Sequence, residues 1–173
     1  MSASNEPSQW PGLTLIVRCR IFRNITMRSD TGGCRVKTYS TEADGFVRNI
    51  SWTDISIDGL EVPGLARSGG GPYCSYVPPG ACSCLSVDER YKPPPSPATH
   101  FVNVTGLVFQ NVSGRCSDPP DFACVDQSVC EVELKDVAIK PAPWRVYKHK
   151  PFEMKCDHVR GTASGSIAPA SCL

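Results

Sequence analysis

A short pattern of apolar and polar positions recurs five times along the chain. Each copy has an apolar residue, a spacer, a small polar or imidazole residue, and then Ile or Val. Successive copies begin 30, 57, 25 and 22 residues apart, and the widest spacing leaves room for two units or for one unit with a large insertion. Such recurrence is typical of a stacked repeat protein. The copies begin at Phe22, Trp52, Phe109, Leu134 and Cys156, and their polar residues are Asn24, Asp54, Asn111, Asp136 and His158.

The residues within one unit predict β-structure. Between Val47 and Leu60, apolar side chains alternate with polar ones, and Asn49 and Asp54 interrupt the alternation. This pattern predicts short strands broken by tight turns, and Asn or Asp at a turn tolerates left-handed backbone angles. Helical repeats are disfavoured because the chain has 16 Pro and 14 Gly and keeps no helical spacing of apolar residues over three turns. The sequence therefore predicts an all-β fold, a parallel β-helix with the polar turn residues stacked in a ladder.

The predicted β-helix domain spans residues 13–173. Residues 1–12 are polar and contain Pro, and we expect a disordered N-terminal segment there. Residues 63–99 are rich in Pro, Gly and Cys, and we expect a disulfide-held loop that leaves the coil stack. The sequence does not assign the partners of Cys19, Cys34, Cys74, Cys82, Cys84 and Cys116.

Cysteine content and charge indicate the compartment and the class of partner. Ten cysteines in 173 residues are many for a reducing cytosol, so disulfides in a secreted or cell-wall protein are the natural use. A net charge of +1 argues against nucleic acid or an acidic membrane as the main partner. The apolar run at residues 13–17 is too short for a signal peptide, and no run is long enough to span a membrane. We therefore expect a start that is missing here, and a complete protein that is a secreted monomer.

Four Asn-x-Ser/Thr sequons also indicate the secretory route. Asn24 and Asn111 fall on the repeated turn position, where the side chain is expected to be enclosed. We therefore predict glycosylation at the other two, Asn49 and Asn103.

The strongest candidate for binding chemistry is the basic pair in Arg35-Val36-Lys37. Residues two apart on a strand share a face, so Val36 can point into the core while Arg35 and Lys37 both project outward. The planar fork of Arg and the point charge of Lys can together hold a carboxylate without a metal. The alternative interpretation is a solvated basic pair that has no ligand.

Three segments carry a resemblance to a known family: GGCRVKT at residues 32–38, GFVRNISW at 45–52, and Tyr73 with Cys74. They resemble the C-terminal part of the polygalacturonase-type pectin hydrolases, glycoside hydrolase family 28, and the resemblance covers nearly all of residues 14–172. It implies a right-handed parallel β-helix, truncated here at its N-terminal end. It also implies that Arg35 and Lys37 bind the galacturonate carboxylate and that Tyr73 lies in the substrate groove.

The resemblance further implies disulfides between Cys124 and Cys130 and between Cys156 and Cys172. In that family, the catalytic aspartates lie on Asn-Thr-Asp and Asp-Asp motifs upstream of the basic pair, followed by Gly-His-Gly. None of these motifs occurs before Arg35 in this chain. Inverting hydrolysis needs two carboxyl groups about 6.5 to 9.5 Å apart. We therefore predict no catalytic residue within the chain.

We also predict no cofactor and no metal site. Cys82-x-Cys84 with His100 could be drawn as a zinc site, but the spacing lacks the usual gap and second half, so disulfide use is favoured. Three hypotheses about function remain. The chain is the C-terminal part of a secreted glycosidase that hydrolyses the α-1,4-galacturonosyl bonds of pectin; or it is a non-catalytic β-helix that binds pectin or another uronate polysaccharide; or it is a structural solenoid without a ligand.

Overall fold

A computed structural model describes residues 15–28, 33–38, 44–58, 83–89, 101–143 and 150–173. Within those ranges the chain forms two parallel sheets and no helix, and hence no helix that could cross a membrane. The five-stranded sheet has the order β1 (Leu15–Arg28), β3 (Gly45–Asp58), β5 (Val102–Cys116), β7 (Cys130–Pro141) and β9 (Arg160–Ala168). The four-stranded sheet has the order β2 (Cys34–Lys37), β4 (Leu85–Asp88), β6 (Asp121–Ala123) and β8 (Lys155–Asp157).

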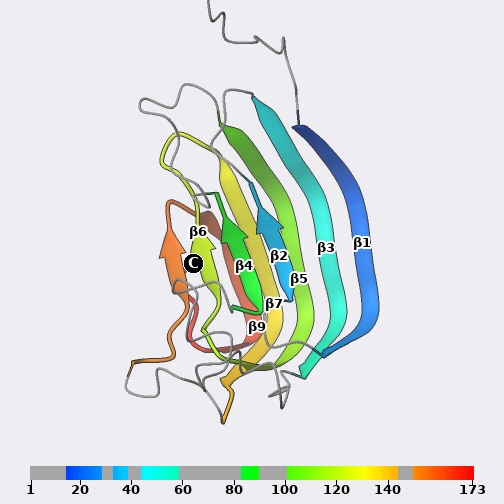
Figure 1. Cartoon of the computed structure of the whole chain (residues 1–173), viewed down its shortest axis with the longest axis vertical. Coiled ribbons are helices and arrows are strands. Elements are labelled where there is room, and N and C mark those ends of the chain that lie inside the picture. The colour runs from blue at the N-terminus through cyan, green and yellow to red at the C-terminus, as the bar shows by residue number, and fades with distance from the viewer. Residues whose placement is uncertain (1–14, 29–32, 39–43, 59–82, 90–100, 144–149) are drawn as a thin grey trace, which may run out of the picture.

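The chain alternates between the two sheets, so each coil adds one strand to each of them. Figure 1 shows the long strands lying side by side and bending around the four short strands. Every strand pairs in parallel with the strand from the next coil. The prediction of an all-β parallel β-helix is confirmed.

The widest repeat spacing is one coil with a large insertion. β3 pairs directly with β5, and β4 lies between them in the sequence. β4 falls within residues 63–99, which were predicted to leave the stack as a loop, yet it pairs with β2 and β6. It returns to the stack because Leu85 and Val87 alternate with Ser86 and are completely buried. The other residues of that range, and residues 1–12, lie outside the described residues.

Each long strand from β1 to β7 bends at single residues with left-handed backbone angles. In β3 these corners are Asn49, with φ of 56°, and Asp54, with φ of 57°. Side chains on a strand point alternately to its two faces, and one corner residue shifts that alternation by one position. The inner face therefore continues through all three segments of the strand. The buried apolar residues of β3 are Val47, Ile50, Trp52, Ile55 and Ile57.

The predicted ladder forms at the second corner. Its four members in β1 to β7 are in register and all have positive φ: Asn24, Asp54, Asn111 and Asp136. Within the ladder, Nδ2 of Asn111 donates a hydrogen bond to Oδ1 of Asp54 over 2.7 Å. The prediction is wrong for the fifth copy. His158 has φ of 52° but lies between β8 and β9. The ladder position of β9, next to Asp136, is taken by Gly165, which directly follows Ser164, the register partner of Lys135.

A second ladder, at the first corner, was not predicted. Cys19, Asn49 and Gly106 stand in register with φ of 49°, 56° and 63°. Asn49 therefore has the same left-handed backbone as Asn24 and Asn111, and all three residues are exposed, so the enclosure expected at Asn24 and Asn111 is not seen. Asn103 is exposed, and its Oδ1 accepts a hydrogen bond from the backbone N–H of Val129 over 2.9 Å. Glycosylation of Asn49 and Asn103 stays a prediction.

A column of aromatic rings runs through the core. The rings of Phe22 and Trp52 stack with centroids 5.7 Å apart, and those of Trp52 and Phe109 with centroids 4.8 Å apart. Phe109 also meets Phe122 of the opposite sheet at 5.9 Å, so the column joins the two sheets. Phe22 ends the column in β1 and is 39% exposed, whereas Phe109 is completely buried.

Three disulfides join described residues. Cys124 is bonded to Cys130, and Cys156 to Cys172, the two pairs that the family resemblance implies. The third bond joins Cys84, beside β4, to Cys116 at the end of β5, and so ties the two sheets together. Cys19 is an exposed free thiol and Cys34 a buried one.

Candidate functional site

The candidate site is the outer face of the four-stranded sheet, and it starts from the alternation in β2. Cys34 and Val36 are buried, so Arg35 and Lys37 project together from the opposite side of the strand. Arg35 is half-buried and Lys37 is exposed. The structure thus brings the predicted basic pair together on one face, while Tyr73 lies outside the described residues.

Asp88 stands beside this basic pair. It lies on β4 directly in register with Lys37, and Nη2 of Arg35 donates a hydrogen bond to its Oδ2 over 2.7 Å. The side chains of Arg35 and Asp88 are 22% and 24% exposed, so water screens the pair only in part. We call Arg35, Lys37 and Asp88 the charged triad. It carries two positive charges and one negative charge near pH 7.

The same face carries further charged residues across β6 and β8. Asp121 and Lys155 follow Arg35 and Ser86 along one row of paired residues. Asp157 lies on the neighbouring row, which starts at Lys37. An imidazole contacts Asp157, because Nε2 of His158 lies 3.3 Å from its Oδ1. Asp121, in register with Lys155, and Asp157, in contact with His158, are thus suited to act as counter-ions of basic groups.

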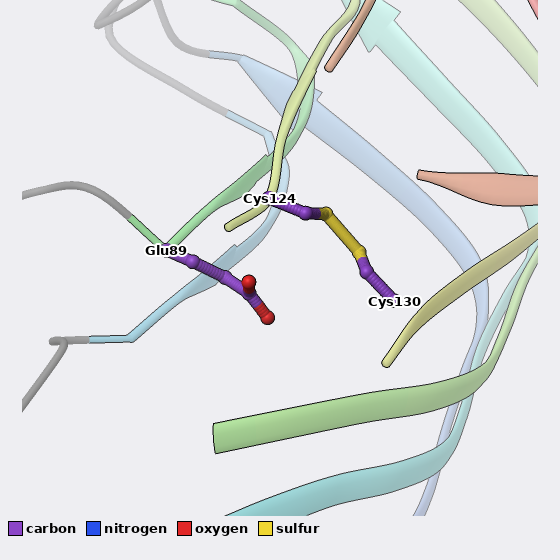
Figure 2. A group of neighbouring side chains, drawn as sticks. All are labelled: Glu89, Cys124 and Cys130. Atoms are coloured by element: carbon purple, nitrogen blue, oxygen red, sulfur yellow. A yellow bond between two sulfur atoms is a disulfide. The ribbon is translucent and has the colours of Figure 1, made fainter. Parts of the chain in front are cut away.

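On the inner side of the same sheet, Glu89 is a buried carboxylate that follows β4. It is 2% exposed, and its Oε2 accepts hydrogen bonds from the backbone N–H of Val125 over 2.9 Å and from Oγ of Ser128 over 2.6 Å. Figure 2 shows its carboxylate directed toward the disulfide between Cys124 and Cys130. Glu89 and the disulfide therefore hold the same turn, because one backbone N–H and one hydroxyl of that turn donate to the buried Oε2.

Glu89, Cys124 and Cys130 also form a group whose ligand atoms lie within 4.8 Å of one another. Thiolates bind metals, but here the two sulfur atoms are bonded to each other, so this group is not a metal site in its oxidised form. The zinc alternative weighed from the sequence loses Cys84, which is bonded to Cys116. Cys82 and His100 lie outside the described residues.

Curated proteins similar to this chain are polygalacturonases of fungi and plants. Probable exopolygalacturonase B of Aspergillus flavus is 25% identical over 162 residues, which cover 88% of this chain and 32% of that protein. The polygalacturonase of Prunus persica is 23% identical over 157 residues (87% and 33%), and that of Gossypium hirsutum is 27% identical over 152 residues (86% and 32%). No family model and no solved structure matches the chain.

The chain is similar to polygalacturonases over most of its length. The resemblance inferred from residues 32–38 and 45–52 is thereby confirmed. This polygalacturonase-like chain spans about a third of the length of the curated relatives it matches.

In the polygalacturonase-like chain, the residue before Arg35 is Cys34, a buried free thiol that should make stability depend on pH. Burial raises the pKa of the Cys34 thiol from 9.0 to about 12. Between these values the folded state keeps a proton that the unfolded chain has lost. The free energy of unfolding should therefore fall as pH rises above 9, by up to about 1.4 kcal/mol per pH unit from this group. Urea unfolding at pH 8, 9 and 10 measures the slope.

The control for this pH dependence is Cys34→Ala, which removes the titrating group. Its free energy of unfolding should decline less steeply with pH than that of the wild type. Equal slopes in the two proteins would contradict the raised pKa of Cys34.

Proposed function

We propose that the chain is the C-terminal part of a secreted glycosidase that hydrolyses α-1,4-galacturonosyl bonds of pectin, and that it holds a substrate carboxylate on Arg35 and Lys37. The observation that carries this proposal is the placement of both cations on one outer face of β2 in a polygalacturonase-like chain. Tyr73 is proposed as the aromatic partner in the same groove. The three disulfides support an oxidising compartment, such as the secretory pathway and the cell wall.

The proposed ligand follows from the charges of the face. Each residue of a uronate chain carries a carboxylate, and Arg and Lys bind carboxylates by charge-assisted hydrogen bonds. The charged triad keeps one net positive charge after Asp88 is counted, so an anionic sugar is favoured over a neutral one. Lys37 is exposed, so its side chain lies on the surface that an arriving polysaccharide would meet.

A non-catalytic uronate-binding protein is the second candidate. Two carboxylates of the face favour this candidate, because each already has a partner in the protein. Asp88 is paired with Arg35, and Asp157 is in contact with His158, so both are suited to act as counter-ions rather than as a catalytic acid and base. Both candidates use the same basic pair. Release of new reducing ends from polygalacturonate by the complete protein separates hydrolysis from binding alone.

We expect Lys37→Ala to weaken binding of trigalacturonate about five- to tenfold while leaving binding of its neutral methyl ester unchanged. The magnitude lies between that of an exposed ion pair and that of a hydrogen bond to a charged group, because Lys37 is exposed before the ligand arrives. Isothermal titration calorimetry of both ligands with both proteins measures the difference.

Lys140→Ala is the matched control, because Lys140 is also exposed but lies at the end of β7 in the other sheet. Its affinity for the acid should equal that of the wild type. Equal affinity of the wild type for acid and ester would contradict the carboxylate clamp and leave a structural solenoid as the better account.

A further inference from the structure

We propose that Asp88 determines specificity on this face, as an internal counter-ion that weakens the binding of acidic sugars and leaves neutral ones unaffected. The inference rests on the proposed function of Arg35 and Lys37. Asp88 belongs to none of the motifs that carry the family resemblance. It was identified only by the pairing of β2 with β4.

The geometry places Asp88 on the strand beside the two cations. It is the register partner of Lys37 on the neighbouring strand, and adjacent strands lie about 4.8 Å apart. Its Oδ2 accepts the hydrogen bond from Nη2 of Arg35 at 2.7 Å, a short distance typical of a charge-assisted bond. A single carboxylate of the protein therefore contacts one cation and directly opposes the other.

A ligand carboxylate must reach the same two cations. It would share the Arg35 guanidinium with Asp88 and would meet the negative charge of Asp88 across the strand pair. The negative charges of the ligand carboxylate and of Asp88 repel each other at close range, whereas a neutral ester has no such penalty. Asp88 therefore lowers the affinity for acid, sets a limit on the preference for acid over ester, and lets bound acidic chains leave the face more readily.

The expected size follows from the exposure of the triad. Arg35 and Asp88 are each about a quarter exposed, so solvent reduces the interaction toward that of a surface ion pair. Removing the charge of Asp88 should then tighten acid binding about two- to fivefold. Added salt should shrink this gain, because the screening length falls to a few ångströms near 1 M salt.

The test is Asp88→Asn, which removes the charge but keeps the shape and an oxygen acceptor for Arg35. Calorimetry with trigalacturonate and its methyl ester, in low salt and again in high salt, compares this variant with the wild type. We expect about two- to fivefold tighter binding of the acid at low salt, a smaller gain at high salt, and unchanged binding of the ester. Asp88→Ser removes the same charge with a different side chain and should shift acid binding in the same direction.

Asp58→Asn is the matched control, because Asp58 also lies between cross-strand cations, Arg28 and Arg115, but at the end of β3 in the other sheet. It should leave both affinities unchanged. Wild-type preference for acid with no gain, or a loss, in both Asp88 variants would overturn this inference and leave the proposed function standing. Failure of the wild type and of both Asp88 variants to bind acid would overturn the two together.

Discussion

Replacing Phe109 by alanine is expected to lower the free energy of unfolding by about 3 to 5 kcal/mol. Phe109 is completely buried, stacks on Trp52, and meets Phe122 of the other sheet. The substitution therefore removes a ring that joins two coils and both sheets, and the packed coils around it cannot easily collapse into the cavity. Urea unfolding followed by far-UV circular dichroism measures the loss.

The matched control is Phe22→Ala, in the same aromatic column. Phe22 is 39% exposed at the β1 end and stacks on Trp52 alone among the described aromatic residues. Its loss should cost about 1 kcal/mol, because much of the ring already contacts water. Equal losses at Phe22 and Phe109 would show that burial in the column does not set the stability.

Removing the disulfide between Cys84 and Cys116 by double alanine substitution is expected to cost about 4 kcal/mol. The bond spans 32 residues, whereas the bond between Cys124 and Cys130 spans 6, for which loop closure gives about 2 kcal/mol. A longer closed loop restricts the unfolded chain more strongly, so the two double variants should differ. Each is compared with the wild type by urea unfolding under oxidising conditions.

The order of these two losses is the decisive observation. If the Cys124 and Cys130 variant loses as much stability as the Cys84 and Cys116 variant, chain entropy is not the main contribution. In that case the contacts around the short bond, including the turn held by Glu89, would be the better explanation.

The sequence predicted the second corner because its residues share a chemistry. Asn24, Asp54 and Asn111 are of the types that accept a left-handed backbone and bond to their neighbours. At the first corner the sequence predicted a turn at Asn49 alone and not a ladder, because Cys19 and Gly106 share no such chemistry with Asn49. His158 matched the local pattern, yet position in the stack depends on how β9 pairs, which local pattern does not determine.

The candidate site was likewise predicted in part. Period-two alternation was enough to place Arg35 and Lys37 on one face of a strand. Asp88 was missed because its contact with Arg35 joins residues 53 positions apart and depends on the register of β2 with β4. Glu89 was missed for a related reason: it follows a strand of only four residues in a Pro- and Gly-rich region, and its partners lie on the turn after Cys124.

The left-handed corners decide which changes of chain length the coils can survive. One residue inserted within an extended segment turns every side chain from that point to the end of the strand inside out. In β3, an insertion after Ile50 would turn Trp52, Ile55 and Ile57 away from the core. Deleting a corner residue also inverts the alternation beyond it and removes the bend. Natural gains and losses of single residues should therefore be rare throughout the long strands and concentrate in the connections between sheets, where coils can diverge while the stack is kept.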